Sequence, residues 1–151
     1  MRHPTNIGRS RWAEREELVD LLEAVTDRVP ATLVKGNHDG EVEDVVPVPV
    51  TDARGTRIGD VGFAHGHTWP SAAVLGASVV CVGHEHPTVR LSDAIGGRRI
   101  ERAWLRGALV RSAFVDHLGD GGDGAALPDG EAELVVFPAF NELVGGTWVN
   151  V

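Results

Sequence analysis

Five of the seven histidines of this chain fall in three short clusters, and each cluster contains a glycine. The clusters are Gly36-Asn37-His38-Asp39, His65-Gly66-His67 and Gly83-His84-Glu85-His86. Neutral imidazoles with amide or carboxylate oxygens suit Mn, Fe, Zn or Ni, and glycine lets the backbone approach a bound group closely. A single cysteine in the chain argues against a structural zinc site built on thiolates. The clusters therefore indicate a metal site of another kind.

Each cluster directly follows a short apolar run that reads as a strand: 31–34, 61–64 and 78–82. Ligands and metals gather at strand ends in open α/β sheets. Each cluster alone has an ordinary interpretation: a Gly36-Asn37 turn, a satisfied core or surface histidine at His65 or His117, or a chance His-x-His pair. Three clusters in this order, all at strand ends, favour one metal site.

Composition narrows the class of protein. The 151 residues are 42% hydrophobic and 24% charged, which is typical of one folded domain. The net charge is −8 and Lys35 is the only lysine, a pattern of salt-loving or GC-rich genomes. That charge disfavours a general nucleic-acid coat protein, although a nucleic-acid substrate held by metals stays open. With one cysteine, no signal peptide and no apolar run of about 18 residues, we expect a cytoplasmic protein with no membrane partner.

Chain length predicts a single, partial domain over 1–151, and the mixture of short strands with fewer helices predicts the α/β or α+β class. A helix is expected from Ser10, as its N-cap, to Asp27, and a shorter helix at 71–77. Residues 118–131, rich in Gly and Asp, are expected to form a flexible loop. Strands are expected at 31–34, 44–51, 57–64, 78–82, 88–91, from the turn at 95–97 through 104, 134–137 and 146–151.

The histidine clusters and their surroundings carry a family resemblance. The chain resembles the calcineurin-like metallophosphoesterases, and it is most similar to the archaeal and the bacterial ligase-associated phosphoesterases of that superfamily. The resemblance covers nearly the whole chain. The phrases that carry it are KGNHDG (35–40), DVGFAHGH (60–67), GHEHP (83–87), WLRG (104–107) and PAFN (138–141).

The resemblance implies a four-layer sandwich of two mixed sheets flanked by helices, and hydrolysis of phosphomonoesters or phosphodiesters. Two divalent metals, Mn²⁺ foremost with Fe, Ni or Zn as alternatives, would hold a hydroxide that attacks phosphorus in line. The substrate is a phosphate ester, with a nucleotide or nucleic acid among the candidates, and the oligomeric state stays open. The implied ligands are Asn37, His65 and His84 for the second metal and His86 for the first.

The same resemblance gives roles to four further residues. His38 would face the phosphate, stabilising developing charge or protonating the leaving oxygen, and Asp39 would orient its ring. His67 is interpreted as a possible second-shell residue or a surface histidine. His3 would be the last residue of an earlier family motif, Gly-Asp-x-x-His.

The chain departs from the family pattern because it lacks Asp-x-His and the Gly-Asp of that second motif, which together supply aspartates to both metals. We therefore expect a fragment, or a start codon placed too late, with an incomplete sandwich and an exposed sheet edge. The phrase Gly145–Asn150, which further strands follow in the family, supports the same expectation. Without a bridging carboxylate, the first metal is expected to be weak or absent, leaving one metal in this chain.

Three functions remain open from the sequence. The first is a metal-dependent phosphoesterase, with activity impaired by the missing motifs. The second is a non-catalytic scaffold or degenerate paralogue of the same fold. The third is a plain metal-binding or structural domain, which leaves His38 and Asp39 without a purpose.

Overall fold

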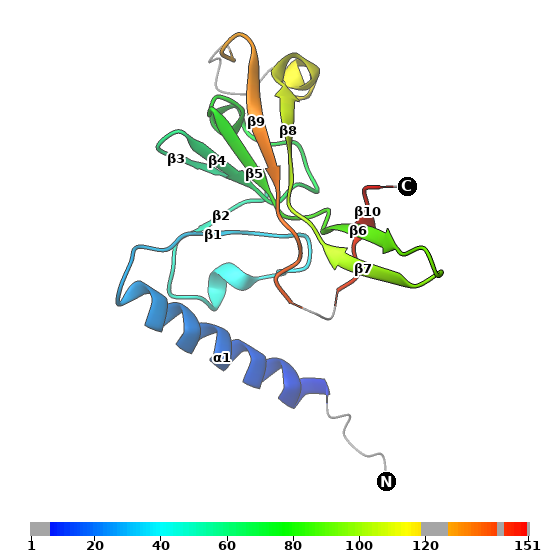
Figure 1. Cartoon of the computed structure of the whole chain (residues 1–151). Helices are drawn as coiled ribbons and strands as arrows, with labels where there is room; N and C mark the ends of the chain where they lie inside the picture. Colours follow the sequence, from blue (N-terminus) through cyan, green and yellow to red (C-terminus); the bar gives the residue numbers. More distant parts are fainter. Residues whose placement is uncertain (1–6, 119–126, 142–143, 151) are drawn as a thin grey trace.

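The main sheet of the protein has five strands, as shown by a computed structural model that describes residues 7–118, 127–141 and 144–150. Its strand order is β3-β4-β5-β9-β8 (Figure 1). The strands are Thr56–Ile58 (β3), Val61–Ala64 (β4), Val79–Val82 (β5), Leu105–Val110 (β8) and Glu131–Val136 (β9). The three central strands are parallel, and β3 and β8 run antiparallel at the two edges. The carboxyl ends of β4, β5 and β9 therefore meet at one edge of the sheet.

A short helix covers this sheet and builds its core. Helix α2 (Ala72–Leu75) is capped by the Ser71 hydroxyl, which accepts a hydrogen bond from the Val74 amide. Val74 and Leu75 are fully buried. The buried core cluster consists of Ala64, Val74, Leu75, Val80, Leu109 and Ala132. Burial of these aliphatic side chains between helix and sheet holds the central strands in place.

A buried arginine, Arg111, connects the core to a second helical segment through hydrogen bonds. Arg111 begins the 3-10 helix η2 (Arg111–His117), and its guanidinium donates to the carbonyl oxygens of Leu75 at 2.8 Å and Ala77 at 2.7 Å. These bonds satisfy carbonyls at the end of α2 that would otherwise be buried without a partner.

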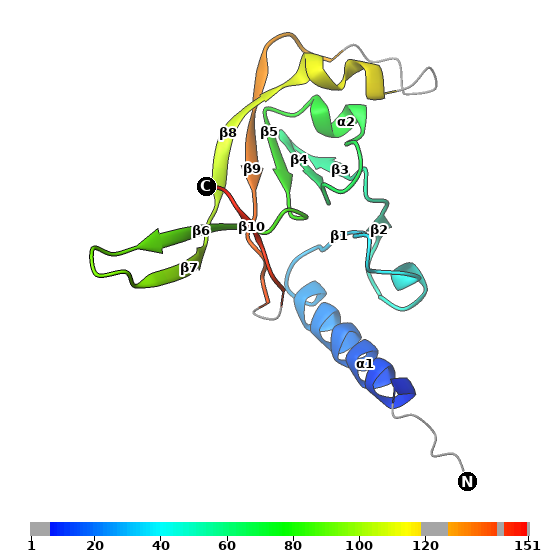
Figure 2. The same cartoon turned by 90° about the vertical axis from the view of Figure 1, so that its right-hand side faces the viewer.

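A three-stranded sheet of order β10-β6-β7 extends from the end of the main sheet (Figure 2). Strands β6 (Pro87–Ser92) and β7 (Arg98–Arg102) form an antiparallel hairpin, and β10 (Thr147–Trp148) lies parallel to β6. Beyond β10, the side-chain oxygen of Asn150 accepts a hydrogen bond from the backbone amide of Arg90 at 2.8 Å. The side-chain nitrogen of Asn150 donates to the backbone carbonyl of Arg90, also at 2.8 Å. The last described residues are thus fixed on the hairpin.

The amino-terminal layer is built differently. It contains helix α1 (Ile7–Thr26), the two-stranded parallel sheet of β1 (Leu33–Val34) and β2 (Val50–Thr51), and the 3-10 helix η1 (Val42–Asp44). Figure 1 shows α1 lying apart from the main sheet. Leu21 is 61% exposed and Val29 is 54% exposed, so the α1 side of this layer buries little apolar surface, whereas Val46 and Val48, just before β2, are buried.

The mixed α/β class agrees with the prediction, whereas the four-layer sandwich stays a prediction. The strands expected at 78–82 and 88–91 and the helix expected at 71–77 are found as β5, β6 and α2. The strand at 134–137 corresponds to β9, and the one expected after the turn at 95–97 is β7. No helix in the described part of the chain is long and apolar enough to cross a membrane.

Several element boundaries were predicted wrongly. Helix α1 begins at Ile7, so Ser10 lies within it, and the strand expected at 57–64 is a hairpin that turns at Gly59, where φ is +60°. The strands expected at 44–51, 31–34 and 146–151 are reduced to the two-residue strands β2, β1 and β10. Strand β8 and η2 were not predicted. Of the loop expected at 118–131, residues 119–126 lie outside the described residues.

Candidate metal centre

The ends of β4 and β5 bring two histidine clusters together. These strands are parallel neighbours, with Ala64 opposite Val82, so His65 and His84 follow at the same sheet edge. The backbone amides of Gly83 and His84 both donate to the His65 carbonyl, at 2.9 and 2.8 Å. The His65 amide in turn donates to the Ala53 carbonyl at 3.2 Å. These bonds fix both histidine backbones relative to the sheet.

Three imidazoles converge at this edge. The ligand nitrogens of His65, His67 and His84 all lie within 4.8 Å of one another. His65 Nε2 is 3.1 Å from His84 Nδ1. Two nitrogens bound to one tetrahedral ion at the usual metal–nitrogen length lie about 3.3 Å apart, so this pair already has the spacing of joint ligands. The set as a whole needs small side-chain rotations to surround one ion.

Asn37 joins the same point from the amino-terminal layer. Its Oδ1 lies 3.0 Å from His65 Nε2. Gly36 permits this approach, since a Cβ there would stand 2.9 Å from Cε1 of the His65 ring. His65 Nε2 thus faces both an amide oxygen and an imidazole nitrogen, and a neutral imidazole has one proton or one lone pair there. A divalent cation satisfies such converging lone pairs.

Electrostatics keep His65 in the form that binds metals. Its pKa lies below the ordinary histidine value, chiefly because partial burial disfavours the charged ring. Positive charge on His84, His67 and His86 lowers the pKa further, while Asp39 opposes the shift. A neutral imidazole offers a lone pair to a cation without first losing a proton.

His38 and Asp39 lie in the same turn as Asn37, outside the cluster of His65, His67 and His84. The Asp39 carboxylate accepts the Gly36 amide at 2.6 Å, which closes the turn. Among the described residues, no hydrogen bond joins Asp39 to His38, and His38 makes no ring contact with the three converging imidazoles. Both residues line a cavity of about 390 Å³ on the side of α1. The structure thus places the expected catalytic pair beside the histidine cluster, not in it.

His86 also stays outside the cluster, although it is only two residues beyond His84. It is the one described residue other than glycine with a left-handed backbone, at φ +45°. It lines a groove of about 350 Å³ between the hairpin and the segments at residue 139 and residues 144–148. His67, which was expected behind the ligands or at the surface, lies within the cluster of His65, His67 and His84. The sequence signal for this placement was the His-x-His spacing of His65 and His67. His3 lies outside the described residues.

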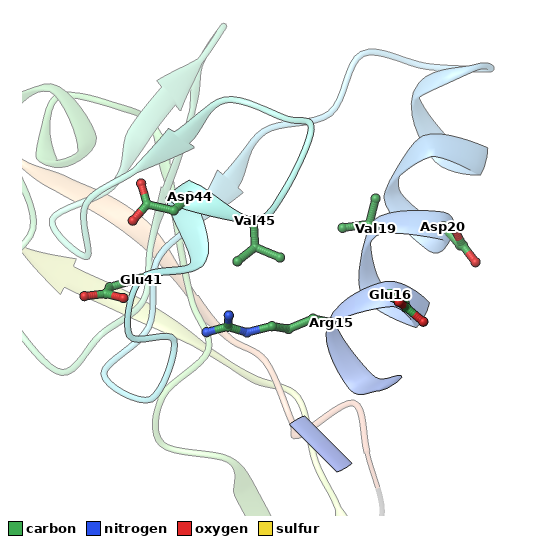
Figure 3. A pocket seen from close by; sticks show the side chains of 7 residues that line it. All are labelled: Arg15, Glu16, Val19, Asp20, Glu41, Asp44 and Val45. Carbon is green, nitrogen blue, oxygen red and sulfur yellow. The ribbon is translucent and has the colours of Figure 1, made fainter. Parts of the chain in front are cut away.

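A cavity of about 440 Å³, which shares Arg15, Glu41 and Val45 with the cavity beside His38, lies between α1 and the turn before β2 (Figure 3). Its charged lining consists of one arginine and four carboxylates: Arg15, Glu16, Asp20, Glu41 and Asp44. Val19 and Val45 complete the lining. Its excess of negative charge makes this cavity unfavourable for an anionic substrate.

The donor set fits one metal ion better than two. Three imidazole nitrogens and one amide oxygen are suitable ligands for a single Mn²⁺, Fe²⁺, Zn²⁺ or Ni²⁺ ion. Within the described residues, the convergent cluster contains no carboxylate. Two dications held close together without an anionic bridge would repel each other strongly.

No known protein family, curated protein or solved structure matches this chain.

Proposed function

We propose that this chain is a metal-dependent phosphoesterase of the calcineurin-like type, whose described residues hold one divalent cation, most suitably Mn²⁺. The convergence of Asn37 Oδ1, His65 Nε2 and His84 Nδ1, at successive separations of 3.0 and 3.1 Å, is the observation that supports this function. A divalent ion held there polarises a phosphoryl oxygen and lowers the pKa of bound water. On this proposal the chain has the four-layer fold of that superfamily in incomplete form.

The chain's own residues supply the remaining steps. The imidazoles of His65, His67 and His84 would bind the cation, and Asn37 would add an oxygen donor from the opposite layer. His38, carried on the turn that Asp39 closes, stabilises charge on the phosphate or protonates the leaving oxygen. That role requires the His38 side chain, which lines the cavity beside α1, to turn toward the cluster.

Hydrolysis of bis-p-nitrophenyl phosphate with Mn²⁺ in high salt tests the proposal. The wild-type chain should release p-nitrophenol, and His65→Ala and His38→Ala should each abolish release. His117→Ala is the matched control, because His117 stacks on Trp69 with ring centroids 3.9 Å apart and belongs to none of the three clusters. Equal activity in His65→Ala and His117→Ala would refute the assignment.

The second candidate is a non-catalytic scaffold of the same fold. It is favoured by one observation: no carboxylate accompanies the three histidines in the described cluster. Under this alternative the folded chain binds Mn²⁺ with a stoichiometry near one and releases no p-nitrophenol. Calorimetric titration of Mn²⁺ beside the hydrolysis assay separates the two functions.

A further inference from the structure

The groove beside His86 differs in charge from the rest of this acidic chain. The strands of the three-stranded sheet carry four arginines and one glutamate, whereas the whole chain has a net charge of −8. The groove lies against this sheet, and its lining includes Arg102 and His86 but no carboxylate. Its chemistry is therefore complementary to an anion.

The groove also contains an aromatic surface held in a fixed position. Trp148 lines it and is 43% exposed. The Arg90 guanidinium lies 4.7 Å from the centroid of the Trp148 ring, and the amides of residues 147 and 149 donate to the carbonyls of His86 and Thr88. Because β10 is bonded to β6 on both sides of Trp148, the indole loses little further freedom when a ligand stacks on it.

Apolar side chains and size complete the description of the ligand. Ile100 and Val144 line the groove beside Trp148, which favours a planar, weakly polar group over a hydrated ion. Its volume of about 350 Å³ falls within the range of roughly 300–1,000 Å³ that small-molecule sites have. Arg102 donates to the Phe140 carbonyl at 3.2 Å, and its remaining N–H groups suit a phosphate.

We propose that this groove binds one nucleotide unit, with its base stacked on Trp148 and its phosphate bonded to Arg102. Stacking on an aromatic ring combined with arginine contacts is the way in which proteins hold single nucleotides of a strand. His86 places the groove next to the histidine clusters. The assignment of the bound nucleotide as substrate rests on the phosphoesterase function, whereas its binding does not.

Binding is measured in EDTA, so that no metal-dependent hydrolysis occurs, with AMP, inorganic phosphate and a fluorescein-labelled ten-nucleotide thymidine strand. Wild-type protein should bind AMP or the strand more tightly than phosphate. Trp148→Leu should weaken binding about fivefold or more, Trp148→Phe should retain most of it, and Arg102→Gln should weaken it about tenfold. Binding of AMP identifies a free nucleotide as the occupant, and binding of the strand alone identifies a nucleic acid.

Arg98→Gln is the matched control for charge, because it removes the same positive charge from the same hairpin and Arg98 does not line the groove. It should change the affinity less than about twofold. An equal loss in Arg98→Gln and Arg102→Gln would overturn the proposal, as would phosphate binding as tightly as AMP, or no nucleotide binding at all. Thermal unfolding of each variant separates loss of binding from loss of folding.

Parallel hydrolysis of bis-p-nitrophenyl phosphate distinguishes this proposal from the proposed function. Hydrolysis by a wild-type chain that binds neither AMP nor the strand removes the nucleotide groove and leaves the phosphoesterase. Nucleotide binding without hydrolysis supports the groove and removes the phosphoesterase.

Discussion

The two sides of the histidine cluster are held by very different amounts of structure. His65 and His84 extend from the central strands β4 and β5, which lie over a fully buried core. Asn37 extends from β1, a strand of two residues whose layer includes the exposed helix α1. The Asn37 side chain contacts the cluster through its Oδ1, which lies 3.0 Å from His65 Nε2. The sheet therefore fixes two of the proposed ligands in advance, and the position of the third depends on the turn that carries it.

The largest expected effect is on the free energy of unfolding, and it appears when a leucine of the core is compared with a leucine of α1. Leu75→Ala empties a fully buried position and should lower the free energy of unfolding by about 2–5 kcal/mol. Leu21→Ala changes a side chain that is 61% exposed on α1 and should lower it by less than about 0.5 kcal/mol. Urea unfolding of both variants gives the two values. Similar losses would show that α1 is as tightly packed as the core.

The next effect concerns metal affinity. His84→Ala removes a nitrogen held by the sheet and should weaken Mn²⁺ binding by about 100-fold, and Asn37→Ala, on the less constrained turn, by about 10-fold. Isothermal titration calorimetry gives both affinities, with His117→Ala as a control that should match wild type. A larger loss in Asn37→Ala would reverse the comparison between sheet and turn.

A smaller effect is expected from pH in the metal-free protein. The pKa of His65 is lowered in the folded state, mainly by burial, so the unfolded chain binds this proton more readily. Stability is therefore expected to be full above about pH 7 and to fall as pH drops through about 6.5, the ordinary histidine pKa. Urea unfolding at pH 7.5 and 5.5 measures the fall. His65→Gln should reduce it; an unchanged fall would assign it to other groups.

The smallest effect lies in the turn itself. Lys35 contacts both carboxylate oxygens of Glu43 at 2.7 Å, which lowers the pKa of Glu43 and closes residues 36–42 into a loop. Both side chains are partly exposed, so Lys35→Met should lower the free energy of unfolding only slightly, as urea unfolding measures. Lys35→Met should also weaken Mn²⁺ binding slightly, because the turn that carries Asn37 becomes less fixed. In a chain that already has Asn37→Ala, adding Lys35→Met should cause no further loss of Mn²⁺ affinity. Additive losses in the double variant would contradict this coupling.

The sequence predicted the structure most accurately where an apolar run ends directly before a histidine cluster. The run at 78–82 and the position of His84 after it follow from short-range pattern alone. The segment 44–51 shows why pattern can fail: Val46 and Val48 are buried, as alternation predicts, but the intervening Pro47 and Pro49 lack the N–H groups that a strand ladder needs. Strand β8 was missed because Arg106, Gly107 and Ala108 break the apolar alternation, and its pairing with β9 decides its conformation.

The candidate site was predictable as a set of residue types and only partly as a geometry. The His-x-His spacing of His65 and His67 could have predicted that both rings lie in one cluster, whereas His67 was expected behind the ligands or at the surface. The turned-away position of His86 depends on a left-handed backbone that no spacing rule for histidines reveals. The direction of His38 depends on how the 36–45 turn lies against α1, which is a tertiary effect.

The bonds between Asn150 and Arg90 join residues 60 positions apart, and they have a consequence for the order of assembly. Hairpin β6–β7 closes over a short turn and forms quickly, whereas the docking of β10 requires a long loop to close. On the ribosome, the hairpin would emerge and fold well before residue 150 is synthesised. The groove beside Trp148 therefore forms only after the hairpin beside it, and a chain in which β10 has yet to dock would not hold a nucleotide there.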